Sequence, residues 1–124
     1  MFPVKKRTQR TTQGRINFKT GKFSETLAGF FLLLHGYRII SYRYKTLVGE
    51  IDILACTKDT LIAVEVKRRL KTDDALSSIY PKQKERIRKA LLHAHKHYPT
   101  FTQLRVDTIL ISPFKWPIHI KNAF

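Results

Sequence analysis

The chain has 124 residues, of which 43% are hydrophobic, so we expect one globular domain with its own core rather than a disordered chain. The single cysteine, Cys56, excludes an intrachain disulfide and any zinc cluster built from cysteines. The 24 Lys and Arg residues outnumber the 9 Asp and Glu residues and give a net charge of +15. This excess favours a polyphosphate partner, nucleic acid above all.

The sequence gives no reason to expect a membrane protein. Its longest apolar run, residues 30–34, is far too short to span a bilayer. The basic start is not followed by the apolar stretch of a signal peptide. We therefore expect a cytoplasmic protein that binds nucleic acid and no membrane.

Residues 1–20 contain six basic side chains, no acidic one and no hydrophobic periodicity, which predicts a mobile basic tail. A single domain is expected over residues 21–124. It opens with a helix from about residue 22 to residue 35, ended by Gly36. Glu25 lies in its first turn, where the helix dipole favours a carboxylate. The predicted core stripe of this helix is Leu27, Phe30, Phe31 and Leu34.

Three strands are predicted next. Residues 37–44 alternate as a strand does, and residues 49–68 are typical of a hairpin of two apolar strands joined by a polar turn at residues 57–60. With Lys58 and Asp59 at the tip of the hairpin, the register places Asp52 opposite Glu65 and Glu50 opposite Lys67. Directly opposed side chains lie about 5 Å apart, and a slip of one residue would put the two acids on different faces.

The predicted pairing of Asp52 with Glu65 is unusual, because like charges opposite each other destabilise a sheet and buried unpaired charges cost more still. A divalent metal between them, with Lys67 nearby, would remove the conflict. The alternative is an exposed hairpin face with an ordinary ion pair between Glu50 and Lys67. Apolar runs on both arms favour burial on both faces, and therefore a site.

A second helix is predicted from Pro81 to about Tyr98, ended by Pro99. The histidines His93, His95 and His97 are spread around such a helix by their two-residue spacing, so solvent-facing positions are favoured over a metal site. The predicted inward stripe is Gln83, Ile87, Ala90, Leu91, Ala94 and Tyr98.

The chain ends with two predicted strands, residues 104–112 and 118–121, joined by a turn. Arg105 and Asp107 share one face of the first of these strands and are expected to pair with each other, so a structural role is favoured for Asp107. His119 is expected to be a partly buried strand residue. The order of elements indicates an α/β or α+β fold with a mixed central β-sheet flanked by helices.

Asp52 followed by Glu65-Val66-Lys67 resembles the acid…(Asp/Glu)-x-Lys signature of the restriction-endonuclease-like nucleases. More closely, the chain resembles the YraN-like bacterial proteins, a largely uncharacterised family with that fold. The matching segments span residues 21 to 124: Gly21-x-x-x-Glu25-x-x-Ala28, Gly36-Tyr37, Gly49-Glu50-Ile51-Asp52, Val64-Glu65-Val66-Lys67-x-Arg69, Arg105-Val106-Asp107 and Asn122-Ala123-Phe124.

The resemblance implies roles for further residues. It makes the Val66 carbonyl a third metal ligand and Glu25 a metal or water ligand. It places Gln83 beside the catalytic Lys67, although the family more often has lysine at or next to this position, which leaves the role open between Gln83, Lys82 and Lys84. The family usually has asparagine where Arg43 stands, which puts any polar contact of that asparagine in doubt. Related resolvases act as dimers, which leaves a homodimer open.

The functional prediction is a metal-dependent nuclease that acts on DNA rather than RNA, including branched or structured DNA, with Mg²⁺ or Mn²⁺ as cofactor. Asp52, Glu65 and Lys67 would carry the chemistry, with Glu25, Glu50 and Gln83 as further candidates. The expected nucleic-acid contacts are Arg43, Arg69, Lys82, Lys84 and Arg86. The alternatives are a non-catalytic nucleic-acid-binding protein of the same fold and a structural or ribosome-associated basic protein.

Overall fold

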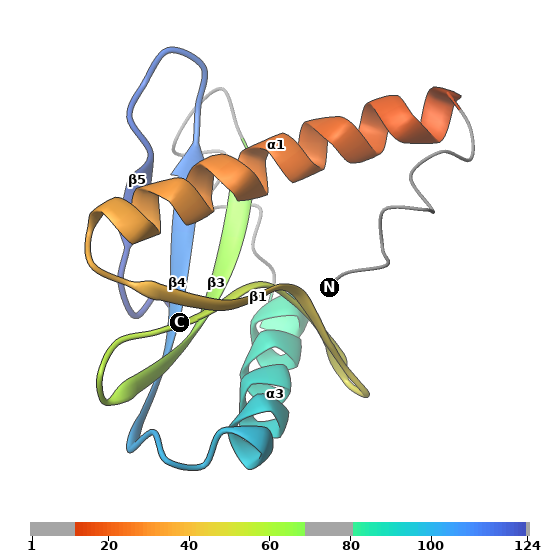
Figure 1. Cartoon of the computed structure of the whole chain (residues 1–124). Helices are drawn as coiled ribbons and strands as arrows, with labels where there is room; N and C mark the ends of the chain where they lie inside the picture. Colours follow the sequence, from red (N-terminus) through yellow and green to blue (C-terminus); the bar gives the residue numbers. More distant parts are fainter. Residues whose placement is uncertain (1–11, 69–80, 124) are drawn as a thin grey trace.

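The computed structural model describes residues 12–68 and 81–123 (Figure 1). Within these ranges the order is helix, three strands, helix and two strands, as the sequence predicts. The elements are α1 (Thr12–Leu34), β1 (Arg38–Thr46), β2 (Gly49–Cys56), β3 (Thr60–Arg68), α3 (Pro81–His97), β4 (Gln103–Ile111) and β5 (Ile118–Ile120). In this part of the chain no helix is long and apolar enough to cross a membrane.

The strands form one five-stranded sheet in the order β1-β2-β3-β4-β5. All neighbouring strands are antiparallel except β3 and β4, which are parallel. Parallel neighbours need a long crossover connection, and α3 lies in the crossover between these two strands. The predicted mixed central sheet is therefore confirmed.

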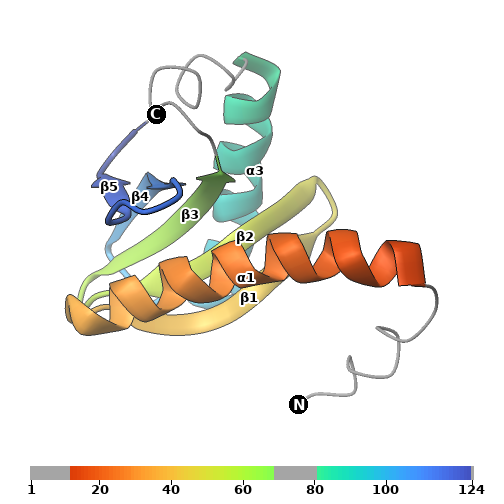
Figure 2. The ribbon, with the colours of Figure 1, turned by 90° about the horizontal axis from the view of Figure 1, so that it is seen from above.

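The two helices cover opposite faces of the sheet (Figures 1 and 2). On the face of α3, Ile87, Ala90 and Leu91 pack against Leu54 and Leu61 of the sheet. The inward stripe predicted for this helix is confirmed, with Gln83 and Tyr98 half-buried at its two ends. The sheet thus has an apolar layer on each side, as expected for strands with apolar runs on both faces.

On the other face, α1 packs with Ala28 and Leu32 fully buried among residues of β2, β3 and β4. The predicted stripe is correct only in part, because Phe30 and Leu34 are 59% and 63% exposed. The helix is rotated so that its small residues face the sheet. At Gly29 an added Cβ would meet the Tyr42 hydroxyl.

The helix α1 also begins at Thr12, ten residues before the predicted start, so the expected boundary between tail and domain falls inside the helix. Its end is as predicted. Gly36 has a φ of 87°, and the N–H groups of Gly36 and Tyr37 donate to the carbonyls of Leu33 and Leu32. This is the glycine-ended helix terminus in which a left-handed residue satisfies the last carbonyls.

Candidate active site

The hairpin of β2 and β3 has the register predicted from its turn. The paired residues run from Cys56 with Leu61 to Ile53 with Val64. Directly after the last pair, the carboxylate of Asp52 accepts a hydrogen bond from the Val66 N–H at 2.9 Å. A side-chain oxygen of Asp52 thus accepts the hydrogen bond of a β3 backbone N–H at the point where the backbone ladder between β2 and β3 ends.

Glu65 lies beside Asp52 at this point, and the two carboxyl groups interact directly. Glu65 is only 8% exposed. Its Oε2 lies 3.4 Å from the Lys67 ammonium and accepts a hydrogen bond of 3.0 Å from the Gln83 amide. The structure therefore brings together Asp52, Glu65, Lys67 and Gln83 from β2, β3 and α3.

Both carboxyl groups are held in surroundings that oppose ionisation. Burial, followed by the charge of Glu65, raises the pKa of Asp52 to about 7. Burial also raises the pKa of Glu65, although Lys67 and Gln83 act in the opposite direction. Because a raised carboxyl pKa means that the anion is disfavoured, a second cation in this position would stabilise the pair.

The register does not extend to Glu50, so its predicted position opposite Lys67 is wrong. Glu50 is exposed and pairs with Lys45 in the ladder between β1 and β2. The reason is that β2 follows β1 beyond Asp52, as the arm formed by these two strands shows in Figure 1. Lys67 is bonded to Glu65 of its own strand instead.

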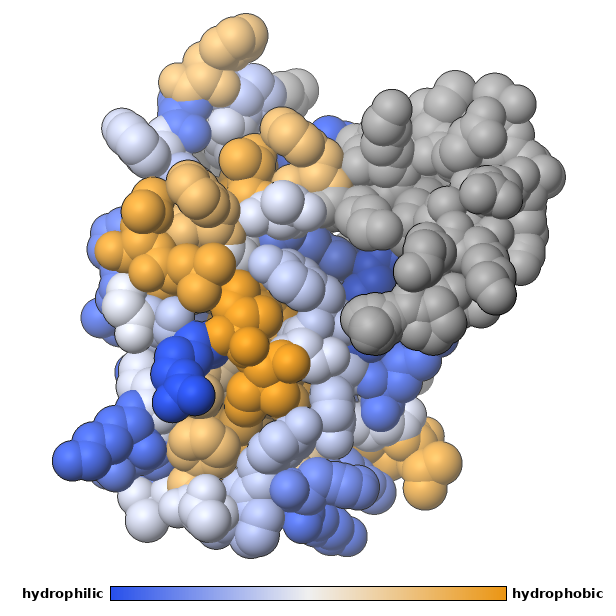
Figure 3. All heavy atoms as spheres, in the orientation of Figure 1, coloured by the Kyte–Doolittle hydropathy of each residue, from blue (hydrophilic) through white to orange (hydrophobic). Residues whose placement is uncertain are grey.

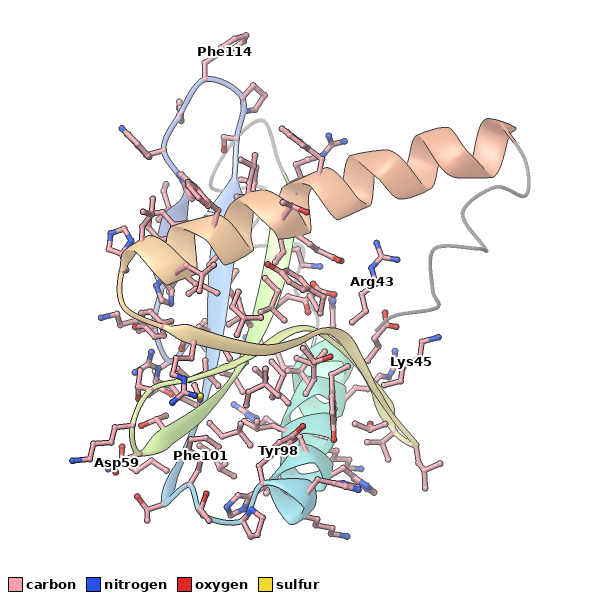
Figure 4. All side chains as sticks on the ribbon, in the orientation of Figure 1. Arg43, Lys45, Asp59, Tyr98, Phe101 and Phe114 are labelled. Carbon is pink, nitrogen blue, oxygen red and sulfur yellow. The ribbon has the colours of Figure 1, made fainter. Side chains whose placement is uncertain are left out.

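Glu25 of α1 reaches the same region from the opposite face of the sheet. Burial raises its pKa, the ion pair with Arg43 lowers it, and the charges of Asp52 and Glu50 raise it further. Glu25 is thus close enough to the acidic pair to feel its charge, yet its nearest cation is the Arg43 guanidinium, with Nε 2.9 Å from Oε1. Figure 4 shows Arg43 extending from the arm of β1 and β2 toward α1.

The backbone at Arg43 is left-handed, with a φ of 53°. In the β1–β2 ladder, Arg43 lies between the pairs Tyr42–Ile53 and Tyr44–Ile51, across from Asp52. Asparagine adopts this conformation more readily than arginine. The Arg43 guanidinium, predicted to contact nucleic acid, donates a hydrogen bond to Glu25.

The other basic residues predicted to bind nucleic acid lie on or near α3. Arg86 is exposed, and its aliphatic stem covers Gly49, where an added Cβ would lie 2.8 Å from the Arg86 Cγ. Lys84 is half-buried on the same helix. Lys82 belongs to α3, but its side chain, like the whole of Arg69, lies outside the described residues.

Within the described ranges, no three side chains of His, Cys, Asp or Glu come together as a metal-binding group. Of the three α3 histidines expected to face solvent, His97 is exposed, while His93 and His95 are half-buried and the His95 ring lies 2.9 Å from the Phe101 carbonyl oxygen. A metal at Asp52 and Glu65 would therefore depend on two carboxylates together with backbone oxygen and water. Mg²⁺ is bound in this manner in many proteins.

Asp107 has the structural role that the sequence predicts. It is fully buried and accepts two hydrogen bonds from Arg105, at 2.8 and 2.9 Å. Sequence reasoning missed two further donors, the His119 ring at 2.7 Å and the Asn122 N–H at 2.8 Å. Together these bonds tie His119 and Asn122 to Asp107 of β4, on the strand next to that of Glu65.

A mixed five-stranded sheet with helices on both faces, and an Asp, a Glu and a Lys where two strands part, define an α+β protein with a restriction-endonuclease-like core. The chain belongs to the Uncharacterised protein family UPF0102, which matches residues 24–111. A UPF0102 protein of Rhodopseudomonas palustris (strain HaA2) is 42% identical over 110 residues, covering 86% of this chain and 85% of the relative. One from Caulobacter vibrioides (strain NA1000 / CB15N) is 38% identical over 117 residues, covering 93% and 94%.

Proposed function

We propose that this protein is a metal-dependent nuclease that hydrolyses phosphodiester bonds in DNA. The observation that carries the proposal is the pair formed by half-buried Asp52 and buried Glu65, with the Lys67 ammonium 3.4 Å from Glu65. Two adjacent carboxyl groups with raised pKa values in a sheet are a conflict that a cation resolves. The net charge of +15 supports a polyphosphate substrate.

The donor set fits Mg²⁺ or Mn²⁺, since both carboxylates offer the hard oxygen ligands these ions prefer. Asp52 and Glu65 would hold the ion, with the carbonyl of Val66, the residue after Glu65, as a further candidate ligand. When bound, such an ion lowers the pKa of water and neutralises charge on the attacked phosphate. Glu25 would join through water, because its carboxylate is bonded to Arg43 in this structure.

The remaining roles follow from the contacts of Glu65. Lys67 would orient the attacking water or stabilise negative charge that develops on the phosphate. Gln83 donates to Glu65 at 3.0 Å and would keep that carboxylate in position. Exposed Arg86 on α3 would contact the phosphate backbone beside the site. We place this activity in the cytoplasm, where bacterial DNA is found.

The test is a cleavage panel of duplex, single-stranded, flapped and branched DNA with Mg²⁺, Mn²⁺ or EDTA. We expect metal-dependent cleavage that falls by roughly 10²-fold or more in Asp52→Ala and in Lys67→Ala. Asp59→Ala and Lys58→Ala make the same charge changes at the exposed tip of the hairpin and should cut like the parent. Equal cleavage by the parent and the two site variants would refute the proposal.

A non-catalytic nucleic-acid-binding protein is the second candidate. Two observations favour it: the described residues hold no group of three metal-ligating side chains, and Arg43 already provides Glu25 with a cation. This function predicts salt-sensitive DNA binding that is unchanged in Glu65→Ala, with no cleavage under either metal. The cleavage panel therefore separates the two candidates.

A further inference from the structure

Outside the acidic pair, the described residues form a cavity of about 700 Å³ between α1 and the loop that joins β4 to β5. Its size is within the range of about 300–1,000 Å³ that is typical of ligand sites. Figure 3 shows hydrophobic side chains gathered on this side of the molecule, over α1 and toward that loop. The aromatic, aliphatic and basic residues of its lining include Phe23, Leu27, Arg68, Phe114, Lys115 and Trp116.

Three aromatic side chains at this cavity are largely exposed to solvent and do not belong to the core. Phe23 is 61% exposed, Trp116 81%, and Phe114 fully so, at the outer tip of the loop in Figure 4. Phe114 also has a φ of 58°, a left-handed conformation that is costly for a bulky residue. Large apolar side chains held on a surface in strained backbone usually mark a contact site.

The charge around the cavity identifies the kind of partner. Arg68 and Lys115 line it, and none of the described lining residues is acidic. Aromatic rings interleaved with cations are typical of single-stranded nucleic-acid sites, where bases stack on rings and phosphates contact cations. A second copy of this chain is disfavoured as the occupant, because each copy carries a net charge of +15.

The cavity adjoins the candidate active site through two elements. On β3, Arg68 directly follows Lys67, and the two side chains point to opposite faces of the strand. On α1, Ser24 lines the cavity and directly precedes Glu25, which bonds to Arg43 at the site. A nucleic-acid strand that passes over the end of β3 could therefore contact both places.

We propose that this cavity binds an unpaired stretch of the DNA substrate, so that the enzyme acts beside a junction between single-stranded and duplex DNA. This inference rests on the proposed nuclease function and specifies its substrate class. Bases stack on Phe23 and Trp116, while Arg68 and Lys115 contact the flanking phosphates. Inside a duplex each base is stacked on both faces, so only an unpaired stretch offers successive bases to the rings.

The experiment uses the fact that Trp116 is the only tryptophan in the chain. With EDTA present, so that no cleavage occurs, the full-length protein is titrated with an oligothymidylate and, separately, with a blunt duplex of the same length. We expect the fluorescence of Trp116 to be quenched by the single strand and left nearly unchanged by the duplex. Equal quenching by both would overturn the inference.

Affinities from fluorescence anisotropy provide the second readout. Loss of one stacked base contact predicts roughly 5- to 150-fold weaker binding of the single strand by Trp116→Ala, with duplex binding unchanged. Leu47→Ala is the matched control, because Leu47 is 95% exposed at the turn between β1 and β2 and does not line the cavity. Unchanged single-strand affinity in Trp116→Ala would overturn the inference.

Three further outcomes test the occupant of the cavity and keep this inference separate from the nuclease proposal. If sedimentation shows a dimer that Trp116→Ala dissociates, a second copy occupies the cavity and the inference is overturned. If Trp116→Ala cuts flapped DNA as fast as the parent with Mn²⁺, the inference fails while the nuclease function stands. If the single strand quenches Trp116 but no substrate is cut, the subsite stands and the nuclease proposal fails.

Discussion

The substitution Asp52→Asn should make the metal-free protein more stable at neutral pH, although it removes a residue central to the proposed site. The asparagine oxygen can accept the same hydrogen bond from the Val66 N–H. The change therefore keeps the shape of the site and removes one negative charge beside Glu65. We expect the gain because burial and that neighbouring charge raise the pKa of Asp52 to about 7.

The sign and size follow from proton linkage. A carboxyl whose pKa is 3.8 when unfolded and about 7 when folded stabilises the protein below about pH 4, and this contribution is lost as pH rises to 7. A pKa shift of about three units corresponds to about 4 kcal/mol of stability. For Asp52→Asn we expect a gain in the free energy of unfolding on the order of 2–4 kcal/mol, because Asp52 and Glu65 share the effect. Asparagine does not ionise, so Asp52→Asn escapes this loss.

The measurement is the free energy of unfolding in urea, at pH 4, 6 and 8, with EDTA throughout. The difference between Asp52→Asn and the parent should be near zero at pH 4 and should grow to its full value at pH 8. Asp59→Asn, at the exposed hairpin turn, should show almost no difference at any of these values. A variant no more stable than the parent at pH 8 would contradict the burial and coupling of the acidic pair.

Three further predictions test other parts of the fold and site. Replacing Asp107 by Ala should lower the free energy of unfolding by about 3–5 kcal/mol, measured in urea, because it leaves the half-buried side chains of Arg105 and His119 without this acceptor. Burial opposes ionisation of Asp107, but bonds from His119, Arg105 and Asn122 prevail and lower its pKa, so its contribution should be present above about pH 4 and lost in acid titration by circular dichroism. Gly29→Ala should destabilise the protein by about 1–3 kcal/mol despite the better helix propensity of alanine, since the added Cβ meets the Tyr42 hydroxyl, and Tyr42→Ala in the same chain should remove most of that loss in a thermal melt. Gln83→Ala should reduce the cleavage rate by roughly 10- to 100-fold, and Gln83→Lys should restore it because lysine can also donate to Glu65; a similar loss in both variants would indicate damage to α3.

The register of the central hairpin could be predicted because it depends on local information. A short turn with Lys58 and Asp59 at its tip fixes every pair that follows, and the pairs from Cys56–Leu61 to Ile53–Val64 are confirmed. The same reasoning brought Asp52 and Glu65 together. It failed at Glu50, because a turn cannot indicate where two strands separate.

The separation of β2 from β3 has a cause that only the folded chain shows. The carboxylate of Asp52 accepts a hydrogen bond from the backbone of β3. On β1, across from Asp52, the backbone of Arg43 takes a left-handed conformation. Arginine gives no sequence signal for that conformation, as glycine or asparagine would.

The orientation of α1 was predicted only in part, since Leu27 and Phe31 pack on the core but Phe30 and Leu34 do not. Apolar periodicity gives weight to large residues, so Phe30 and Leu34 were expected to face the sheet. Close approach of the helix instead favours Ala28 and Gly29, which carry little hydrophobic weight. The bonds between Asp107 and His119 were also missed, because residues on different strands give no local pattern.

The acidic pair itself was predictable because its residues contradict their surroundings. Apolar strands that are buried on both faces should not contain adjacent carboxylates, and here they do so with raised pKa values. A purely structural explanation has difficulty with this arrangement, since Lys67 and Gln83 both contact Glu65 and the pKa of Asp52 still rises to about 7. Arg43, the cation nearest to Glu25, also leaves the Glu25 pKa raised. A divalent ion would supply further positive charge beside Asp52. For this reason, a substitution of Asp52 should change both the stability of the metal-free protein and the proposed cleavage activity.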